Sequence, residues 1–303
     1  MANAPQTSIV SKLPQFARHL CLELKPDANA EQLRRAMAQV PFLTQAFNKE
    51  FPQAGISSTV ALSPAAWQLL YAEPCPNVIP FPEVQLKRES IPPSPTDFFI
   101  HVCSDQFDLA LELTLSILHW FQHDTVLTDE TVGFRYFGER DLTGFAGHTK
   151  EQLTKEEKTK YAVVSKPDSA EDGGSYVNIQ RFVFDMPRWQ GLAESSQEEV
   201  MGKDKRTGND IHPDEEDMPH IHRVRQAGNV NIVRAGMPYG NAKEQGHFFV
   251  SYANKADAFI RILDAMTQCD SYGHSDPLLR YAKPVSGAAL FAPSIDFLIK
   301  HSL

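Results

Sequence analysis

The 303-residue sequence has few cysteines, no long basic run and no long apolar run. Its four cysteines lie far apart and form no Cys-x-x-Cys pair, so they indicate neither a zinc knuckle nor a redox pair. The net charge of −9 argues against a nucleic-acid partner, because phosphates require a basic face. No apolar run approaches the roughly 18 residues of a membrane span, and no basic-then-apolar leader opens the chain. We therefore expect a soluble, cytoplasmic protein with reduced thiols that acts on small molecules.

The length allows two domains, since a domain usually holds about 100 to 200 residues. In the first half, apolar alternation and helical spacing predict strands at 17–24, 57–62, 96–103 and 125–138 and main helices after Asn29 and at 106–121. The proline-rich stretch 74–82 is a predicted link. The order strand, helix, strand, strand, helix, strand is that of a ferredoxin-like fold.

The same order recurs in the second half. Predicted strands cover 176–184, 247–252 and 288–292, predicted helices cover 195–201 and 256–267, and a hairpin within 220–234 supplies two further strands. The expected fold class is therefore α+β, with two ferredoxin-like halves, antiparallel β-sheets and peripheral helices. We expect an N-terminal half at 1–138, a connecting segment at 139–174 and a C-terminal half at 175–303.

The predicted hairpin carries two candidate functional residues. Ile221–Arg225 and Val230–Arg234 flank Gly228-Asn229, a pair that supplies the positive φ of a tight turn. Pro219 would deliver His220 at the start of the first strand, where the missing amide donor costs least. The hairpin thus pairs a candidate ligand, His220, with a candidate cation, Arg234. The acidic run 214–217 before it is expected to be a solvated loop.

Several separate segments carry a resemblance to a known family. Residues 140–145 read Arg-Asp-Leu-Thr-Gly-Phe and are followed by Thr149, 202–206 read Gly-Lys-Asp-Lys-Arg, 219–221 read Pro-His-Ile, 234–240 read Arg-Ala-Gly-Met-Pro-Tyr-Gly, 284–287 read Pro-Val-Ser-Gly and 291–294 read Phe-Ala-Pro-Ser. In this order the segments resemble the dye-decolourising peroxidases, and most of all their shorter bacterial type. These are haem enzymes built from two fused ferredoxin-like halves.

The resemblance implies a haem b peroxidase that oxidises organic donors such as dyes with hydrogen peroxide through a ferryl intermediate. It places His220 as the proximal iron ligand and Arg234 in the distal pocket as the stabiliser of negative charge. Phe145, Thr149 and Arg206 are the further residues that it places at the cofactor. A ligating histidine generally hydrogen-bonds an acceptor through its other ring nitrogen, and Asp276 is our candidate by position.

The chain departs from the family pattern at the distal acid–base residue. The family's aspartate falls on Gly147, and the glycine after it falls on His148. His148 is a possible substitute base, since imidazole can take the proton that peroxide must lose. It is equally open that His148 ligates the iron or is a solvent-facing bystander, and whether the Gly-His pair is natural or engineered is undecided.

Other readings stay open. Taken alone, His220 is also explained as a surface or capping residue, and Arg234 as a salt-bridged strand residue. A haem-binding or haem-trafficking protein with incidental peroxidase activity is the alternative function, and a haem-free ferredoxin-like binding module is the third. Exposed sheet edges favour a homo-oligomer. The aromatic side chains that could relay electrons, although core packing explains most of them, are Trp120, Trp189, Tyr136, Tyr239, Tyr252 and Tyr281.

Overall fold

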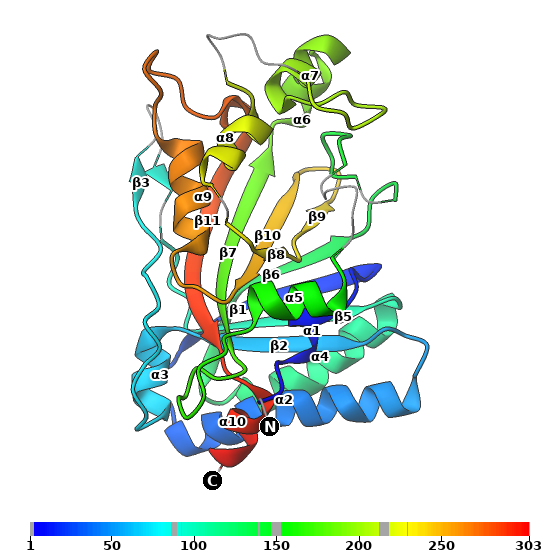
Figure 1. Ribbon diagram of the computed structural model, residues 1–303. Helices are drawn as coiled ribbons and strands as arrows, with labels where there is room; N and C mark the ends of the chain where they lie inside the picture. Colours follow the sequence, from blue (N-terminus) through cyan, green and yellow to red (C-terminus); the bar gives the residue numbers. More distant parts are fainter. Residues whose placement is uncertain are drawn as a thin grey trace.

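The computed structural model describes residues 3–85, 90–91, 93–138, 140–146, 153–211, 218–228 and 230–302 (Figure 1). Among these residues, nine strands form one continuous antiparallel sheet in the order β7-β11-β2-β5-β1-β6-β9-β10-β8, and a β7–β10 pairing closes it into a ring. No helix in this part of the chain combines the length and apolar character needed to cross a bilayer.

The first four-stranded unit is ferredoxin-like, as predicted. Its elements are β1 (Phe16–Leu24), α2 (Ala30–Glu50), β2 (Ser57–Leu62), α3 (Pro64–Leu70), β5 (Phe98–Ser104), α4 (Phe107–Phe121) and β6 (Thr125–Phe134). The Asn29 side chain caps α2 by accepting hydrogen bonds from the amides of Glu31 and Gln32. Helices α2 and α4 cover one face of the sheet, where Leu20 and Leu22 of β1 pack in their core (Figure 1).

The second unit repeats this architecture. Its main elements are β7 (Ser175–Phe184), α6 (Met186–Gln190), α7 (Glu194–Met201), α8 (His220–Gln226), β8 (Val233–Arg234), β9 (Met237–Gly240), β10 (Gln245–Ala253), α9 (Ala258–Thr267), η1 (Pro277–Arg280) and β11 (Ala282–Ala292). The strand order β11-β7-β10-β9 matches β6-β1-β5-β2 of the first unit. The predicted fold class, α+β with two ferredoxin-like halves, is therefore confirmed. The remaining elements are α1 (Thr7–Val10), β3 (Val84–Gln85), β4 (Ser90–Ile91), α5 (Lys155–Ala162) and α10 (Ile295–Lys300).

Two narrow seams join the units. Phe291 of β11 pairs with Leu62 of β2, and Gly133 of β6 pairs with Tyr239 of β9. The strands of each unit form one part of this ring, and we call these parts the first and the second sheet. Their inner faces share one core, in which Cys21 and Phe99 of the first sheet pack with residues such as Val250 of the second. Successive side chains of a strand point to opposite faces of the sheet. In the second unit, alternate side chains of each strand therefore lie in this core, and the others lie on the outer face.

The predicted hairpin at 220–234 is wrong. His220–Gln226 forms helix α8, with Pro219 as its N-cap residue, and only Val233–Arg234 is a strand, paired with β10. Ile221, Val224 and Ala227 are spaced by three, so the short apolar run fits a helix as well as a strand. Gly228 does have positive φ (77°), where it ends the helix, and Asn229 lies outside the described residues. The second strand of this unit is β9 instead.

Candidate functional site

A pocket lies on the outer face of the second sheet, beneath α8 and α9. The outward rows of β7 and β10 form its floor, and α9 contributes Phe259, Ile262, Leu263 and Met266, which share one helix face. Chain segments after β6 and around β9 complete the wall. We call this pocket the His220 pocket. The polar and charged residues that line it are Arg135, Tyr136, Arg140, Asp141, Gln180, His220, Arg234 and His247.

His220 is the first residue of α8 and lines the pocket. Its Nδ1 lies 2.7 Å from Oδ2 of Asp276, whose side chain is fully buried. The other oxygen of Asp276 accepts a hydrogen bond from the amide of Leu278 (2.9 Å), at the start of η1. The carboxylate is therefore held from both sides, and Nε2 of His220 bonds to no described residue. His222, two positions on, directs its Nε2 to the carbonyl oxygen of Ile211 instead (3.1 Å).

Arg234 lines the same pocket from the end of β8, where it pairs in register with Ser251 of β10. Arg234 is exposed to the open space of the pocket, and the protein that surrounds this space partly desolvates the guanidinium and lowers its pKa. Arg234 makes no side-chain hydrogen bond or ion pair with any residue that the structure describes. Its positive charge is thus available to a ligand.

The chain after Arg234 packs tightly against β10. A Cβ atom at Gly236 would lie 2.6 Å from the carbonyl oxygen of Phe248 and 2.8 Å from Nε2 of His247, so only glycine allows this approach. Further along, the hydroxyl of Tyr239 donates to the carbonyl oxygen of Phe182 (3.1 Å). The position of Arg234 is therefore supported by its ladder with β10 and by the anchored strand that follows.

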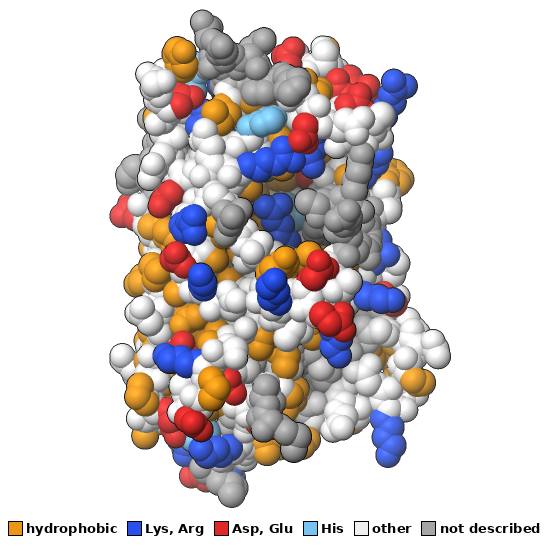
Figure 2. Space-filling view, in the orientation of Figure 1, with side chains coloured by type: hydrophobic (Ala, Val, Ile, Leu, Met, Phe, Trp, Pro, Cys, Tyr) orange, Lys and Arg blue, Asp and Glu red, His pale blue; other side chains and the backbone are white. Residues whose placement is uncertain are grey.

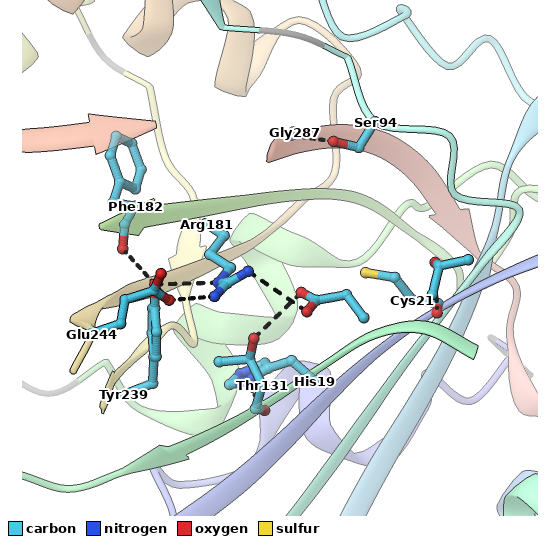
Figure 3. A network of polar contacts seen from close by, with 11 residues as sticks. His19, Cys21, Ser94, Thr131, Arg181, Phe182, Tyr239, Glu244 and Gly287 are labelled. Carbon is cyan, nitrogen blue, oxygen red and sulfur yellow. Dashed lines mark hydrogen bonds and ion pairs between the residues drawn. The ribbon is translucent and has the colours of Figure 1, made fainter. Parts of the chain in front are cut away.

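A polar network on the inner face of the sheet holds that strand. Arg181 of β7 donates from Nε to the hydroxyl of Tyr239 (3.2 Å) and forms an ion pair with Glu244. In Figure 3 the Arg181 side chain points toward the hydroxyl of Tyr239 and the carboxylate of Glu244, which lie together on one side of it. The guanidinium lies 5.2 Å from the centre of the Tyr239 ring. A second ion pair joins Arg181 to Asp129 of β6 (3.7 Å) and links the two sheets at this end.

A second pocket adjoins the first and shares Leu13, Val224, Arg234 and Ile262 with it. Lys12 and Lys158 line it, together with Arg225, whose guanidinium pairs with Asp210. Burial lowers the pKa of Lys158, and the charge of Lys12 lowers it further. Figure 2 shows Lys and Arg side chains gathered between α8 and α5 on this face. Arg234 is therefore a residue that borders both pockets.

The structure does not bring every predicted residue to the pocket. Phe145 is buried, but it packs against Trp189 and Met201 and lies under the Nζ of Lys205. Arg206 is exposed and does not line the pocket. Gly147, His148 and Thr149 lie outside the described residues.

Asp141 is a pocket residue that sequence reasoning passed over. It stands in the Arg-Asp-Leu segment, which served only as a family marker, although its place just after a strand end was a signal for a site. Its Oδ1 accepts hydrogen bonds from the amide (2.8 Å) and the hydroxyl of Thr143. Burial raises the pKa of the Asp141 carboxyl, and the Thr143 hydrogen bonds and the nearby His220 partly offset that rise.

The comparisons with known proteins agree with one another. A family model described as Dyp-type peroxidase, N-terminal, matches residues 6–135, and one described as Dyp-type peroxidase, C-terminal, matches residues 138–297. A dye-decolorizing peroxidase from Mycobacterium tuberculosis is 31% identical over 309 residues, covering 98% of this chain and 90% of the relative.

Two solved structures show the same likeness. A dye-decolorizing peroxidase from Bacteroides thetaiotaomicron superposes with a TM-score of 0.90 at 25% identity, covering 99% of each chain. A DypB variant from Rhodococcus jostii RHA1 in complex with heme has a TM-score of 0.87 at 25% identity and covers 98% of this chain and 99% of its own.

Proposed function

Because the chain belongs to the Dyp-type peroxidase family, we propose that it uses hydrogen peroxide to oxidise small organic donors, dyes among them, at a haem b in the His220 pocket. One observation carries the assignment of the site. The same pocket is lined by His220, whose Nδ1 bonds a buried carboxylate, and by Arg234, whose charge pairs with no described residue.

The donor set fits a haem. Among the described residues no cluster of three or more His, Cys, Asp or Glu side chains could hold a metal ion by itself. A single imidazole at an apolar pocket suits a metal whose other ligands are supplied by a macrocycle. The aliphatic and aromatic side chains of β7, β10 and α9 suit its apolar faces.

His220 would hold the iron through Nε2. In this role Asp276 accepts a hydrogen bond from Nδ1–H of His220, which favours the tautomer with a free Nε2 lone pair and makes the imidazole a stronger electron donor to the metal. When bound, the haem supplies the electrons that reduce peroxide and receives electrons from the donors. In this proposal Arg234 stabilises the negative charge that develops on the departing oxygen, as an oriented cation in a partly enclosed site does well.

His148 is our proposed substitute for the family's distal aspartate, on the strength of its position in the motif alone. Phe145, Thr149 and Arg206 remain proposed cofactor residues for the same reason, although Phe145 and Arg206 do not line the pocket as described. We also propose the division into 1–138, 139–174 and 175–303, in which residues 139–150 cap a haem held mainly by the C-terminal half. Arg140 and Asp141 line the pocket together with residues of the second sheet, which supports this arrangement.

The test begins with the purified protein and hemin. We expect a Soret band, saturable multi-turnover oxidation of an anthraquinone dye that depends on peroxide, and loss of both in His220→Ala. His222→Gln is the matched control, because this neighbouring imidazole of α8 faces Ile211. A protein that binds hemin through His220 without turning over donors would be a haem carrier. A protein that stays colourless with hemin would refute the assignment.

A further inference from the structure

The second pocket combines several positive charges with no described negative one, and we call it the Lys158 pocket. Lys12, Lys158, Arg225 and Arg234 line it, and no Asp or Glu is among the described residues that do so. The whole chain, in contrast, has a net charge of −9. The positive lining is therefore a local feature that the composition of the chain does not explain.

Three of these four cations are unpaired. The guanidinium of Arg225 forms an ion pair with Asp210 (2.6 Å). Within the part of the chain that the structure describes, no ion pair involves Lys12, Lys158 or Arg234. Lys12 lies between α1 and β1, whereas Lys158 is on α5 and Arg234 is on β8. The tertiary fold thus brings three free positive charges to one cavity.

Lys158 is oriented and under repulsion. Its Nζ donates to the carbonyl oxygen of Ser11, which leaves two of its three N–H groups without a described acceptor. Burial lowers the pKa of Lys158, and the charge of Lys12 lowers it further. Like charges held close together cost the fold stability, and a bound anion would remove that cost.

The rest of the lining suits an aromatic ring. The floor offers few free polar groups, because Nδ1 of His101 lies 2.8 Å from the hydroxyl of Tyr252 and its Nε2 lies 3.2 Å from Sγ of Cys103. The cavity volume of about 360 Å³ is at the lower end of the range of small-molecule sites. A small aromatic ring with one anionic group matches this space. The apolar and aromatic side chains of the wall include Leu13, Tyr161, Ile221, Val224, Val233 and Ile262.

The Lys158 pocket lies beside the proposed haem site. Leu13, Val224, Arg234 and Ile262 line both this pocket and the His220 pocket. Side chains that belong to both linings are thus what separates the two cavities. A molecule in the Lys158 pocket is a neighbour of the redox centre without competing with peroxide for space in the His220 pocket.

We propose that the Lys158 pocket binds the electron donor, and that this donor is an aromatic acid whose anionic group is held by Lys12 and Lys158. Arg234 adds to the positive potential at the border of the two pockets. This inference rests on the proposed peroxidase function. Each donor gives up one electron and the proton of a ring hydroxyl, so two donors convert one hydrogen peroxide into two molecules of water. The anionic group keeps its charge and serves only for binding.

The test compares syringate, a phenolic acid, with methyl syringate, its uncharged ester. Calorimetry should show that the haem-loaded wild type binds syringate about tenfold more tightly than the ester. In the double variant Lys12→Gln and Lys158→Gln, the Kd and the KM for syringate should both rise about tenfold, the effect of losing one charge-assisted hydrogen bond.

The matched control is Lys155→Gln, one turn before Lys158 on α5. Lys155 is exposed and does not line the pocket, so the Kd for syringate should change by less than about twofold. The Tm of the ligand-free double variant should not fall, because the substitutions remove like-charge repulsion. A lower Tm with an unchanged Kd would show that the lysines have a structural role and would overturn the inference.

Haem has carboxylates of its own, and loading with hemin separates the two sources of anion. Under the proposal, syringate binds the haem-free and the haem-loaded protein with similar Kd, and the double variant retains hemin. Displacement of syringate by hemin, together with faster hemin loss from the double variant, would assign the lysines to the haem and overturn the inference.

The remaining outcomes distinguish this inference from the proposed function. Haem-loaded wild type that oxidises neither syringate nor its ester with peroxide defeats the proposed function and the donor site with it. Turnover of both donors with equal KM, or a double variant with the wild-type Kd for syringate, overturns the inference alone.

Discussion

At the scale of single residues, the polar groups of this protein are oriented by partners far away in the sequence. His220 and Asp276 are 56 positions apart, and their hydrogen bond joins α8 to the segment after α9. Asp141 is different, since its partner Thr143 is only two positions away, and burial raises the pKa of its carboxyl. A carboxyl whose pKa is raised in the folded state destabilises the fold when charged, so its retention in the pocket is consistent with a functional use.

A second group of buried polar residues lies between the two sheets. His101 is 1% exposed, stacks on His19 at 5.0 Å and holds Nδ1 2.8 Å from the hydroxyl of Tyr252. Burial lowers the pKa of His101 to about 3, and that of His19 is lowered by burial and by His101. Both imidazoles are therefore neutral in the folded protein at pH 7.

This neutrality predicts acid sensitivity. The unfolded chain takes up a proton at His101 below pH 6.5 and the folded chain does not, so stability is lost as the pH falls below that value. Between pH 7 and pH 5 the loss from one such histidine is about 2 kcal/mol. We measure the free energy of unfolding in urea at pH 7 and at pH 5. The difference between the two values should be smaller in His101→Gln than in the wild type by about this amount. Replacing exposed His119 by Gln should leave the difference unchanged; equal pH slopes in wild type and His101→Gln would contradict the prediction.

At the scale of elements, α8 is a short helix that must hold His220 in place. Arg223, which is 2% exposed, fastens it: the guanidinium pairs with Asp270 (2.5 Å) and donates to the carbonyl oxygens of Met218 (3.1 Å) and His274 (2.9 Å). A seven-residue helix is marginal alone, so tertiary contacts of this kind determine its stability. The clamp joins α8 to the 268–274 segment that leads to Asp276.

We therefore predict that Arg223→Met weakens haem retention about tenfold or more, because it frees both the helix of His220 and the segment of Asp276, and loss of such outer contacts usually costs a metal site that much. Hemin transfer to apomyoglobin measures the effect. Arg225→Gln is the control on the same helix, where the ion pair with Asp210 is about half exposed and contributes little. Equal retention by both variants would show that α8 is held by other contacts.

At the scale of the whole molecule, the two units share one ring of strands and one inner core. Phe291, which is 1% exposed, stands at the seam opposite Leu62 and packs edge-on against Trp67 of the first unit (5.9 Å) and Tyr176 of the second (5.2 Å). This arrangement makes the stability of each unit depend on the other.

Phe291→Ala should lower the unfolding free energy by about 3 to 5 kcal/mol, since it opens a cavity where the two units meet. Far-UV circular dichroism and tryptophan fluorescence should report one coincident transition in both wild type and variant. Phe42→Ala, at a residue that is 45% exposed on α2, should change stability by no more than about 0.5 kcal/mol. Two separated transitions in the wild type would mean that the seams do not couple the units.

The sequence by itself determined the local elements and the family. Residues close together in the sequence suffice to predict several elements. Examples are the long alternating run at β1, the Asn29 cap of α2 and the apolar face of α9. Only the tertiary structure decided that His220 begins a helix, because the apolar run at 221–227 is too short for its period to choose between helix and strand. It alone closed the two sheets into a ring, and it alone placed Asp141 in the pocket with His220 and Arg234. These outcomes depend on packing between segments far apart in the chain, and no local pattern of residues contains that information.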